Sequence, residues 1–136
     1  MNHEGHKVHE ALDARVNVWA REIVDAGLKV HKILGPGLLE SAYEHCLAYE
    51  LQTSGLKFQR QTALPIVYEA TQLDAGYRLD LIVENAIITE IKAVDALAPI
   101  HEAQLLTYLK LSGCRLGFLI NFNVVLFKQG IKRMIL

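Results

Sequence analysis

The fold of this chain is decided by residues Tyr77–Val94, which read YRLDLIVENAIITEIKAV. The apolar residues of this stretch predict two strands joined by a turn near its middle. Asp80 interrupts the first strand, and Glu90 and Lys92 interrupt the second. Charged side chains within apolar strands are costly unless they are paired or hold a metal ion. The stretch therefore predicts a strand pair that carries a charged site.

The length of the turn decides whether the two acidic residues meet. A two-residue turn at 84–85 would direct Asp80 and Glu90 to opposite faces of the sheet, because side chains alternate along a strand. A three-residue turn at 84–86 sets Asp80 opposite Glu90. A site that uses both carboxylates requires an odd-length turn or a bulge, and we expect Asn85 to adopt a positive φ.

Two carboxylates that face each other repel, and a divalent cation between them removes the repulsion. Carboxylate oxygens with several waters suit Mg²⁺ or Mn²⁺, and the backbone carbonyl of Ile91 is a further candidate ligand. Such an ion lowers the pKa of a bound water. Lys92 would orient that water, help to deprotonate it or stabilise developing negative charge. The alternative is a salt bridge between Lys92 and a carboxylate across the sheet.

Apolar periodicity predicts the elements around this stretch. We expect helices over 13–34, 38–54 and 101–111, and further strands over 56–61, 65–68, from 73 onward, 115–121, 124–127 and 131–135. Helices and strands in one chain of 136 residues predict a single α/β domain over residues 13–136. Residues 1–12 are polar and are expected to form a flexible tail.

Two of the expected helices carry polar residues that could join the site. Glu40, in the first turn of its helix, either suits the helix dipole or points into a cleft beside the strands. On the third expected helix, His101, Gln104 and Tyr108 form one polar edge. Glutamine can hold a metal-bound water or a phosphate, and tyrosine can hydrogen-bond a phosphate or stack on a base.

Taken together, these motifs resemble the PD-(D/E)xK nuclease superfamily, and in particular its small GxxExxY family. Residues Gly37–Glu44 read GLLESAYE and contain the pattern that names that family. The core pattern of the superfamily is read in Arg78–Asp80 and Glu90–Lys92. The Gln104 and Tyr108 pair is similar to that of recombination-type exonucleases in the superfamily. The resemblance extends from about residue 30 to the C-terminus.

The resemblance implies a restriction-endonuclease-like fold, which is a central mixed β-sheet flanked by α-helices. It also implies a metal-dependent phosphodiesterase site with Mg²⁺ or Mn²⁺ as the cofactor. By position, Asp80 and Glu90 become metal ligands and Lys92 becomes the catalytic lysine. The chain departs from the pattern at Leu79, where the family motif has proline. This departure affects strand geometry more than chemistry.

The resemblance further assigns three supporting residues by position. Glu40 becomes the helix carboxylate that reaches the metal through water. Gln104 and Tyr108 become supports of the active site. The implied partner is nucleic acid, with DNA favoured over RNA.

Composition restricts how such a partner could bind. The formal net charge is −1, so a nucleic acid would meet a local patch or a metal rather than a generally basic surface. Two cysteines are too few for a disulfide framework, and no segment is long enough to span a bilayer, which together favour a cytoplasmic protein. The apolar segment 124–135 is compatible with a homodimer. The modest basic content favours the alternative function, a catalytically weak or silent module that binds nucleic acid or protein on a nuclease-like fold.

Overall fold

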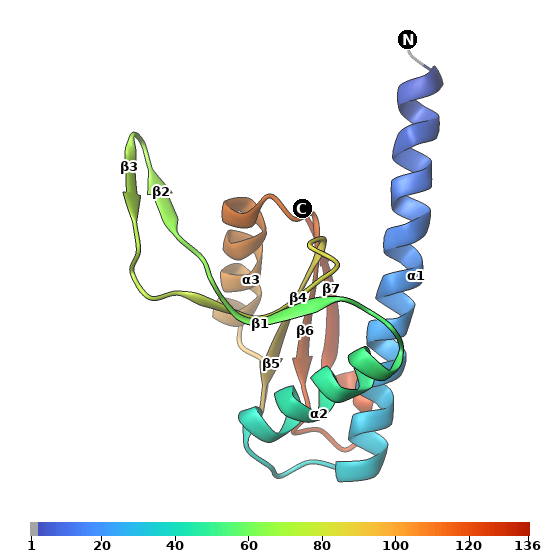
Figure 1. Ribbon diagram of the computed structural model, residues 1–136. Coiled ribbons are helices and arrows are strands. Elements are labelled where there is room, and N and C mark those ends of the chain that lie inside the picture. The colour runs from blue at the N-terminus through green and yellow to red at the C-terminus, as the bar shows by residue number, and fades with distance from the viewer. Residues whose placement is uncertain (1–2) are drawn as a thin grey trace.

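The computed structural model describes the backbone of residues 3–136 and the side chains of residues 14–136 (Figure 1). In these residues the helices are α1 (His3–Leu34), α2 (Glu40–Thr53), α3 (Pro99–Ser112) and the short 3₁₀ helix η1 (Phe127–Gln129). The strands are β1 (Phe58–Ala63), β2 (Ile66–Tyr68), β3 (Thr71–Leu73), β4 (Arg78–Val83), β5 (Ile87–Lys92), β6 (Leu116–Asn121) and β7 (Ile131–Ile135). The tail expected over residues 1–12 falls on residues whose side chains lie outside this description.

The main sheet has the strand order β1-β4-β5-β6-β7. The β5–β6 pair is parallel and the other three pairs are antiparallel, so the sheet is mixed, as expected. Helix α3 makes the crossover from β5 to β6, which a parallel pair requires. The predicted mixed sheet flanked by helices is therefore confirmed.

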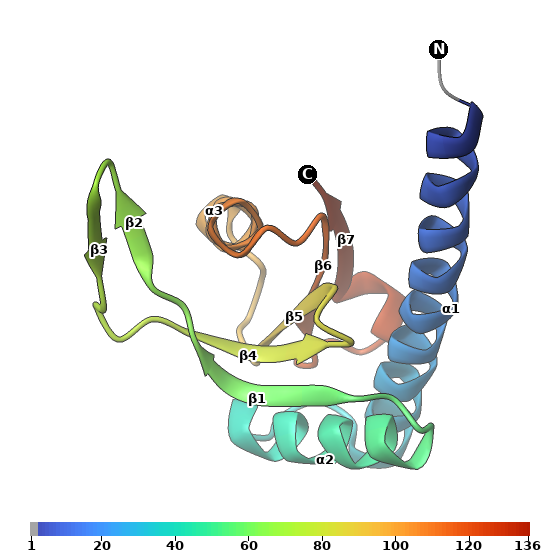
Figure 2. The same ribbon diagram turned by 45° about the horizontal axis from the view of Figure 1, so that its top comes forward.

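The sheet is buried on both faces (Figure 2). One core packs α1 and α2 against one face and includes Ile87 and Ile91 of β5. The other core packs α3 against the opposite face and includes Ile88 of the same strand. Burial on both sides explains why the central strands read as nearly continuous apolar runs rather than as alternating ones.

The turn between β4 and β5 has three residues. Val83 pairs with Ile87, and the nitrogen of Ala86 donates a 2.9 Å hydrogen bond to the carbonyl of Val83. Glu84 and Asn85 both have positive φ, at 53° and 54°. The prediction of an odd-length turn with positive φ at Asn85 is therefore confirmed.

Helix α2 begins at Glu40, two residues later than expected, because Tyr43 organises the segment before it. The hydroxyl of Tyr43 donates a 2.6 Å hydrogen bond to the carbonyl of Gly35 and accepts one of 3.1 Å from the nitrogen of Leu38. Gly37 lies within this segment at φ 99°, a conformation that glycine adopts without steric cost. Tyr43 is fully buried, so the loop that precedes Glu40 is fastened to the core.

The strand expected over 124–127 is wrong. This segment leads into η1, and Phe127 is buried against Phe122, with ring centroids 6.0 Å apart. Gly130 follows, and a Cβ at this position would overlap the carbonyl oxygen of Asn121. The close backbone approach folds the chain back into β7, so only the later of the two expected terminal strands forms.

The strands expected over 65–68 and from 73 onward form as a hairpin of β2 and β3, but β3 ends at Leu73 instead of beginning there. This hairpin stands away from the main sheet in both views (Figures 1 and 2). The helices among the described residues include none with the length and apolar character that crossing a bilayer requires.

Candidate functional site

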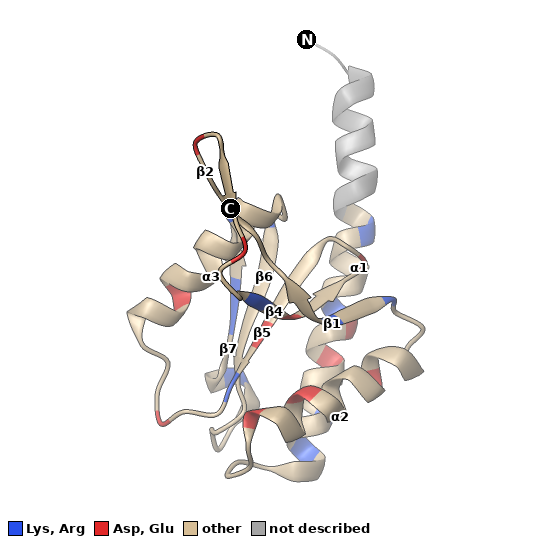
Figure 3. Cartoon of the chain, turned by 60° about the vertical axis from the view of Figure 1, so that its left-hand side comes forward, with Lys and Arg blue, Asp and Glu red and all other residues tan. Residues whose placement is uncertain are grey.

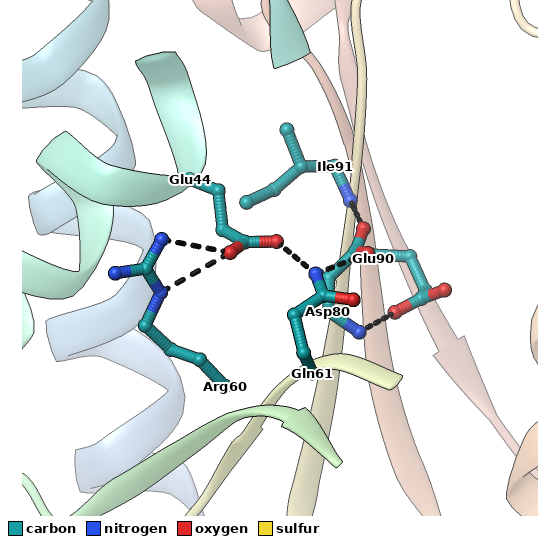
Figure 4. Close-up of polar contacts among 6 residues, drawn as sticks. All are labelled: Glu44, Arg60, Gln61, Asp80, Glu90 and Ile91. Atoms are coloured by element: carbon teal, nitrogen blue, oxygen red, sulfur yellow. Dashed lines mark hydrogen bonds and ion pairs between the residues drawn. The ribbon is translucent and has the colours of Figure 1, made fainter. Parts of the chain in front are cut away.

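The acidic pair, Asp80 and Glu90, lies where strands β4 and β5 separate. Regular pairing between the strands ends at Leu81 and Thr89. Beyond that point the nitrogen of Asp80 donates a 2.8 Å hydrogen bond to Oε2 of Glu90, and the nitrogen of Ile91 donates one of 2.8 Å to Oδ2 of Asp80 (Figure 4). The two carboxylates thus accept the hydrogen bonds that backbone carbonyls would accept if the regular pairing continued. These bonds hold the two side chains together at the point where the strands separate.

Burial makes this pair electrostatically unfavourable. Glu90 is only 5% exposed, and loss of solvation followed by the charge of Asp80 raises its pKa to about 8. Burial also raises the pKa of Asp80, although the hydrogen bond from Ile91 opposes that change. Without a cation, the pair therefore retains a proton at neutral pH.

The oxygens of this pair fit a divalent metal ion. Oε1 of Glu90 has no hydrogen-bond partner among the described side chains and backbone, and Oδ1 of Asp80 has only a long contact of 3.4 Å with Gln61. Within residues 14–136, no three His, Cys, Asp or Glu side chains form a group that could hold an ion. The direct side-chain ligands would be these two carboxylates, and Mg²⁺ is commonly held by one or two carboxylates with several waters.

Lys92 follows Glu90 by two residues on β5 and is half-buried. Its charge lowers the pKa of both Asp80 and Glu90, but this effect is smaller than the rise that burial causes in each pKa. The ion pairs of the described residues are Lys29–Glu50, Arg60–Glu44 and Lys132–Glu102. The alternative of a cross-strand salt bridge made by Lys92 is therefore wrong, and its ammonium group is available to another partner.

Helix α3 brings Tyr108 to the same region. Tyr108 is buried, and after burial itself the charge of Glu90 is the largest influence that raises its pKa. Gln104 lies one turn earlier and is half-buried, with no side-chain hydrogen bond within the described part of the chain. His101 does not belong to this edge, because its Nδ1 accepts a 3.0 Å hydrogen bond from the nitrogen of Ala98 and caps the helix.

Helix α2 contributes two carboxylates, and they lie in different surroundings. Oε1 of Glu40 accepts a 3.4 Å hydrogen bond from the nitrogen of Ala93, just beyond Lys92. Glu44, one turn later, is the acid that interacts with the pair, since its charge raises the pKa of both Asp80 and Glu90. Figure 3 shows acidic positions on α2, β4 and β5 in one region, with basic positions scattered over several elements.

Glu44 is itself held by two residues of β1. Its Oε2 accepts hydrogen bonds of 3.1 and 2.9 Å from Nε and Nη2 of Arg60, and its Oε1 accepts one of 2.6 Å from Nε2 of Gln61. The same amide nitrogen of Gln61 is 3.4 Å from Oδ1 of Asp80 (Figure 4). Gln61 therefore bridges the helix carboxylate to the strand carboxylate.

Comparison with known families assigns the chain. A model of the PD-(D/E)XK nuclease superfamily matches residues 17–134. The chain belongs to this superfamily. No curated protein and no solved structure matches it. Nucleases of this superfamily generally use divalent metals, and the matched residues include the acidic pair, Lys92 and all of α2 and α3.

The superfamily pattern does not reveal all of the residues that shape the site. Gln61 has φ 51°, a strained conformation for a non-glycine residue, and the regular pairing of β1 with β4 skips Gln61 and Asp80. Asn121, at the end of β6, is 2% exposed and holds the chain after Lys92, since its side chain bonds both the nitrogen and the carbonyl of Val94. No sequence pattern pointed to Gln61 or Asn121, whereas Glu44 lies one helical turn after Glu40 on α2.

Proposed function

We propose that this protein is a metal-dependent phosphodiesterase that hydrolyses nucleic acid. The observation that carries the proposal is the pair of half-buried Asp80 and buried Glu90, which lie side by side with raised pKa values and form none of the ion pairs of the described residues. A structural role gives no reason to gather two largely desolvated acids without a charged partner, because their repulsion lowers stability. A divalent ion supplies the missing charge.

Each residue of the site has a role in this proposal. Asp80 and Glu90 would hold Mg²⁺ or Mn²⁺, with the backbone carbonyl of Ile91 as a further ligand and Glu40 acting through water. When bound, the ion supplies Lewis-acid stabilisation of the negative charge on the phosphate. Lys92 orients the attacking water and assists the departure of its proton. The oxygen of that water bonds to phosphorus as its proton passes to solvent, and the bond from phosphorus to the leaving oxygen breaks as that oxygen takes up a proton from solvent.

Helix α3 and the segment before α2 complete the proposal. Gln104 and Tyr108 support the substrate phosphate from α3, and DNA is proposed over RNA because this pair is similar to that of recombination-type exonucleases. Membership of the GxxExxY family is supported by Gly37 and Tyr43, whose conformation and hydrogen bonds set the start of α2. We propose one cytoplasmic domain over residues 13–136.

A homodimer is a further part of the proposal. Strand β7 lies at the edge of the main sheet, and Ile135 near its end is 64% exposed. An apolar edge strand offers unpaired backbone groups to a second copy.

One observation favours a second function, a catalytically silent binding module. Two surface cavities of the described residues lie along α1 rather than at the acidic pair, and one of them, of about 900 Å³, is lined by α1, β6 and β7. A silent module has no need of a metal, so calorimetry with Mg²⁺ and Mn²⁺ separates the two functions.

The deciding experiment is a cleavage panel. The purified protein is incubated with Mg²⁺ or Mn²⁺ and with single- and double-stranded DNA and RNA, and a chelator is added to a parallel series. We expect cleavage that the chelator abolishes and that Lys92→Ala eliminates. Absence of both cleavage and metal binding would leave only the silent module.

A further inference from the structure

Tyr77 presents an aromatic side chain to solvent beside the candidate site. Tyr77 is 45% exposed and lies three residues before Asp80, a separation that extended chain spans in about 10 Å. Its ring packs edge-on against Tyr108, with centroids 6.4 Å apart and planes at 64°. Tyr108 in turn lies close enough to Glu90 to respond to its charge. An exposed aromatic face therefore adjoins the acidic pair.

The position of this aromatic face is fixed. The nitrogen of Leu64 donates a 2.9 Å hydrogen bond to the carbonyl of Tyr77 at the base of the β2–β3 hairpin, just before β4 begins. The buried Tyr108 supports one edge of the ring. A ring held in this way loses little conformational entropy when a ligand packs on it.

A cationic residue follows Tyr77 in the chain. Arg78 is exposed, and its guanidinium takes part in none of the ion pairs of the described residues. Aromatic faces that stack on bases, combined with cations that contact the backbone, are how proteins bind single-stranded nucleic acid. Bases within a duplex are already stacked on their neighbours and offer a protein only their edges.

We propose that Tyr77 stacks on an unpaired base next to the phosphate that a metal ion at Asp80 and Glu90 would hold, while Arg78 contacts a neighbouring phosphate. The preferred substrate is therefore single-stranded nucleic acid or an unpaired segment of a duplex. This inference rests on the proposed nuclease function and adds its substrate class. Tyr77 acts in substrate selection rather than in the chemical step.

The test measures affinity with Ca²⁺ in place of Mg²⁺, after recovery of intact oligonucleotide has been verified. The probes are fluorescent oligothymidylate, oligouridylate and a short DNA duplex, followed by anisotropy. Tyr77→Leu keeps apolar bulk against Tyr108 but removes the aromatic face, and Tyr77→Phe keeps both. Tyr68→Leu is the matched control, because Tyr68 is 69% exposed on the β2–β3 hairpin.

We expect Tyr77→Leu to weaken single-strand binding by about tenfold, and Tyr77→Phe to remain within about twofold of the wild type. Tyr68→Leu should bind like the wild type. Arg78→Gln should reduce the slope of log affinity against log salt by about one unit. Comparison of the thymidylate and uridylate probes shows whether the DNA or the RNA oligomer binds more tightly.

The inference is overturned if Tyr77→Leu binds single strands as tightly as the wild type, or if the variant loses the same factor on the duplex. Equal melting temperatures of the variants exclude misfolding as the cause of a loss. Mg²⁺-dependent cleavage by the wild type separates the two proposals. If the wild type cleaves and Tyr77→Leu binds normally, only the substrate class is wrong, whereas a wild type that neither binds nor cleaves refutes both.

Discussion

The backbone nitrogen of Asp80 donates a 2.8 Å hydrogen bond to the carboxylate of Glu90 on the neighbouring strand. The carboxylate of Asp80 accepts a bond of the same length from the residue after Glu90. Each acid is thus positioned by the strand of the other. These bonds orient the two side chains without cancelling their charges, so a proton or a cation must supply the compensation.

The stability of the metal-free protein should fall as pH rises through the range set by Glu90. Its pKa increases from 4.5 to about 8 on folding, so between these values the folded state holds a proton that the unfolded state has lost. The contribution of Glu90 to the free energy of unfolding is therefore greatest below pH 4.5. It decreases as the pH rises to about 8, by at most about 1.4 kcal/mol per pH unit.

Glu90→Gln isolates this effect. The variant should lack the decline and should exceed the wild type in unfolding free energy above pH 7 when a chelator is present. Urea unfolding at a series of pH values measures it. Glu102→Gln is the control, since Glu102 is an acid of α3 that forms its ion pair with Lys132 and not with the residues of the acidic pair. Parallel pH profiles for the wild type and Glu90→Gln would contradict the assignment.

Mg²⁺ should raise the melting temperature of the wild type, and more at pH 8 than at pH 6. At the lower pH Glu90 retains its proton, and the proton competes with the metal. At a concentration 100 times its dissociation constant, the ion increases the free energy of unfolding by about 2.7 kcal/mol. Calorimetric melting of Asp80→Asn should show no such rise, and this variant should be as stable as the metal-free wild type or more so. A rise of equal size in Asp80→Asn would place the ion elsewhere.

Lys92→Ala should reduce metal-dependent cleavage by at least about 100-fold and leave stability nearly unchanged. The catalytic loss follows from its proposed contact with the attacking water. The small effect on stability follows because Lys92 is half-buried and makes no ion pair in the part of the chain that the structure describes. Lys110→Ala, on the exposed face of α3, is the matched control. Cleavage at the wild-type rate would remove Lys92 from the mechanism.

Gln61 and Glu44 should shift the pKa of Asp80 in opposite directions. The hydrogen bond from Gln61 favours the charged form of Asp80, so Gln61→Gly should raise its pKa. The charge of Glu44 disfavours that form, so Glu44→Gln should lower the pKa. Carboxyl carbon shifts in NMR titrations of metal-free protein report both values. Glycine tolerates the positive φ at position 61, so the first variant should fold. If both substitutions shifted the pKa of Asp80 in the same direction, the proposed bridge of Gln61 between Glu44 and Asp80 would be wrong.

Parts of this architecture were predictable because they depend on local pattern. The apolar runs on either side of residues 84–86 indicated two strands, and the requirement that Asp80 meet Glu90 selected the three-residue turn. The helical periods placed α2 and α3 within a few residues of their observed bounds. The strand expected over 124–127 failed because a buried Phe127 fits a 3₁₀ turn as well as a strand, and the contact between Gly130 and Asn121 is not a local property.

The amino-acid sequence alone determined that the chain forms an α/β domain whose central strands carry Asp80, Glu90 and Lys92, since hydrophobic spacing and strand alternation act over a few neighbouring residues. Only the tertiary structure decided that Gln61 hydrogen-bonds both Asp80 and a carboxylate of α2, and that this carboxylate is Glu44 rather than Glu40. The contact of Tyr77 with Tyr108 was likewise decided by the tertiary structure alone. These contacts join residues 17 to 31 positions apart. They depend on how helices α2 and α3 pack across the two faces of the sheet, and periodicity along one segment carries no information about that packing.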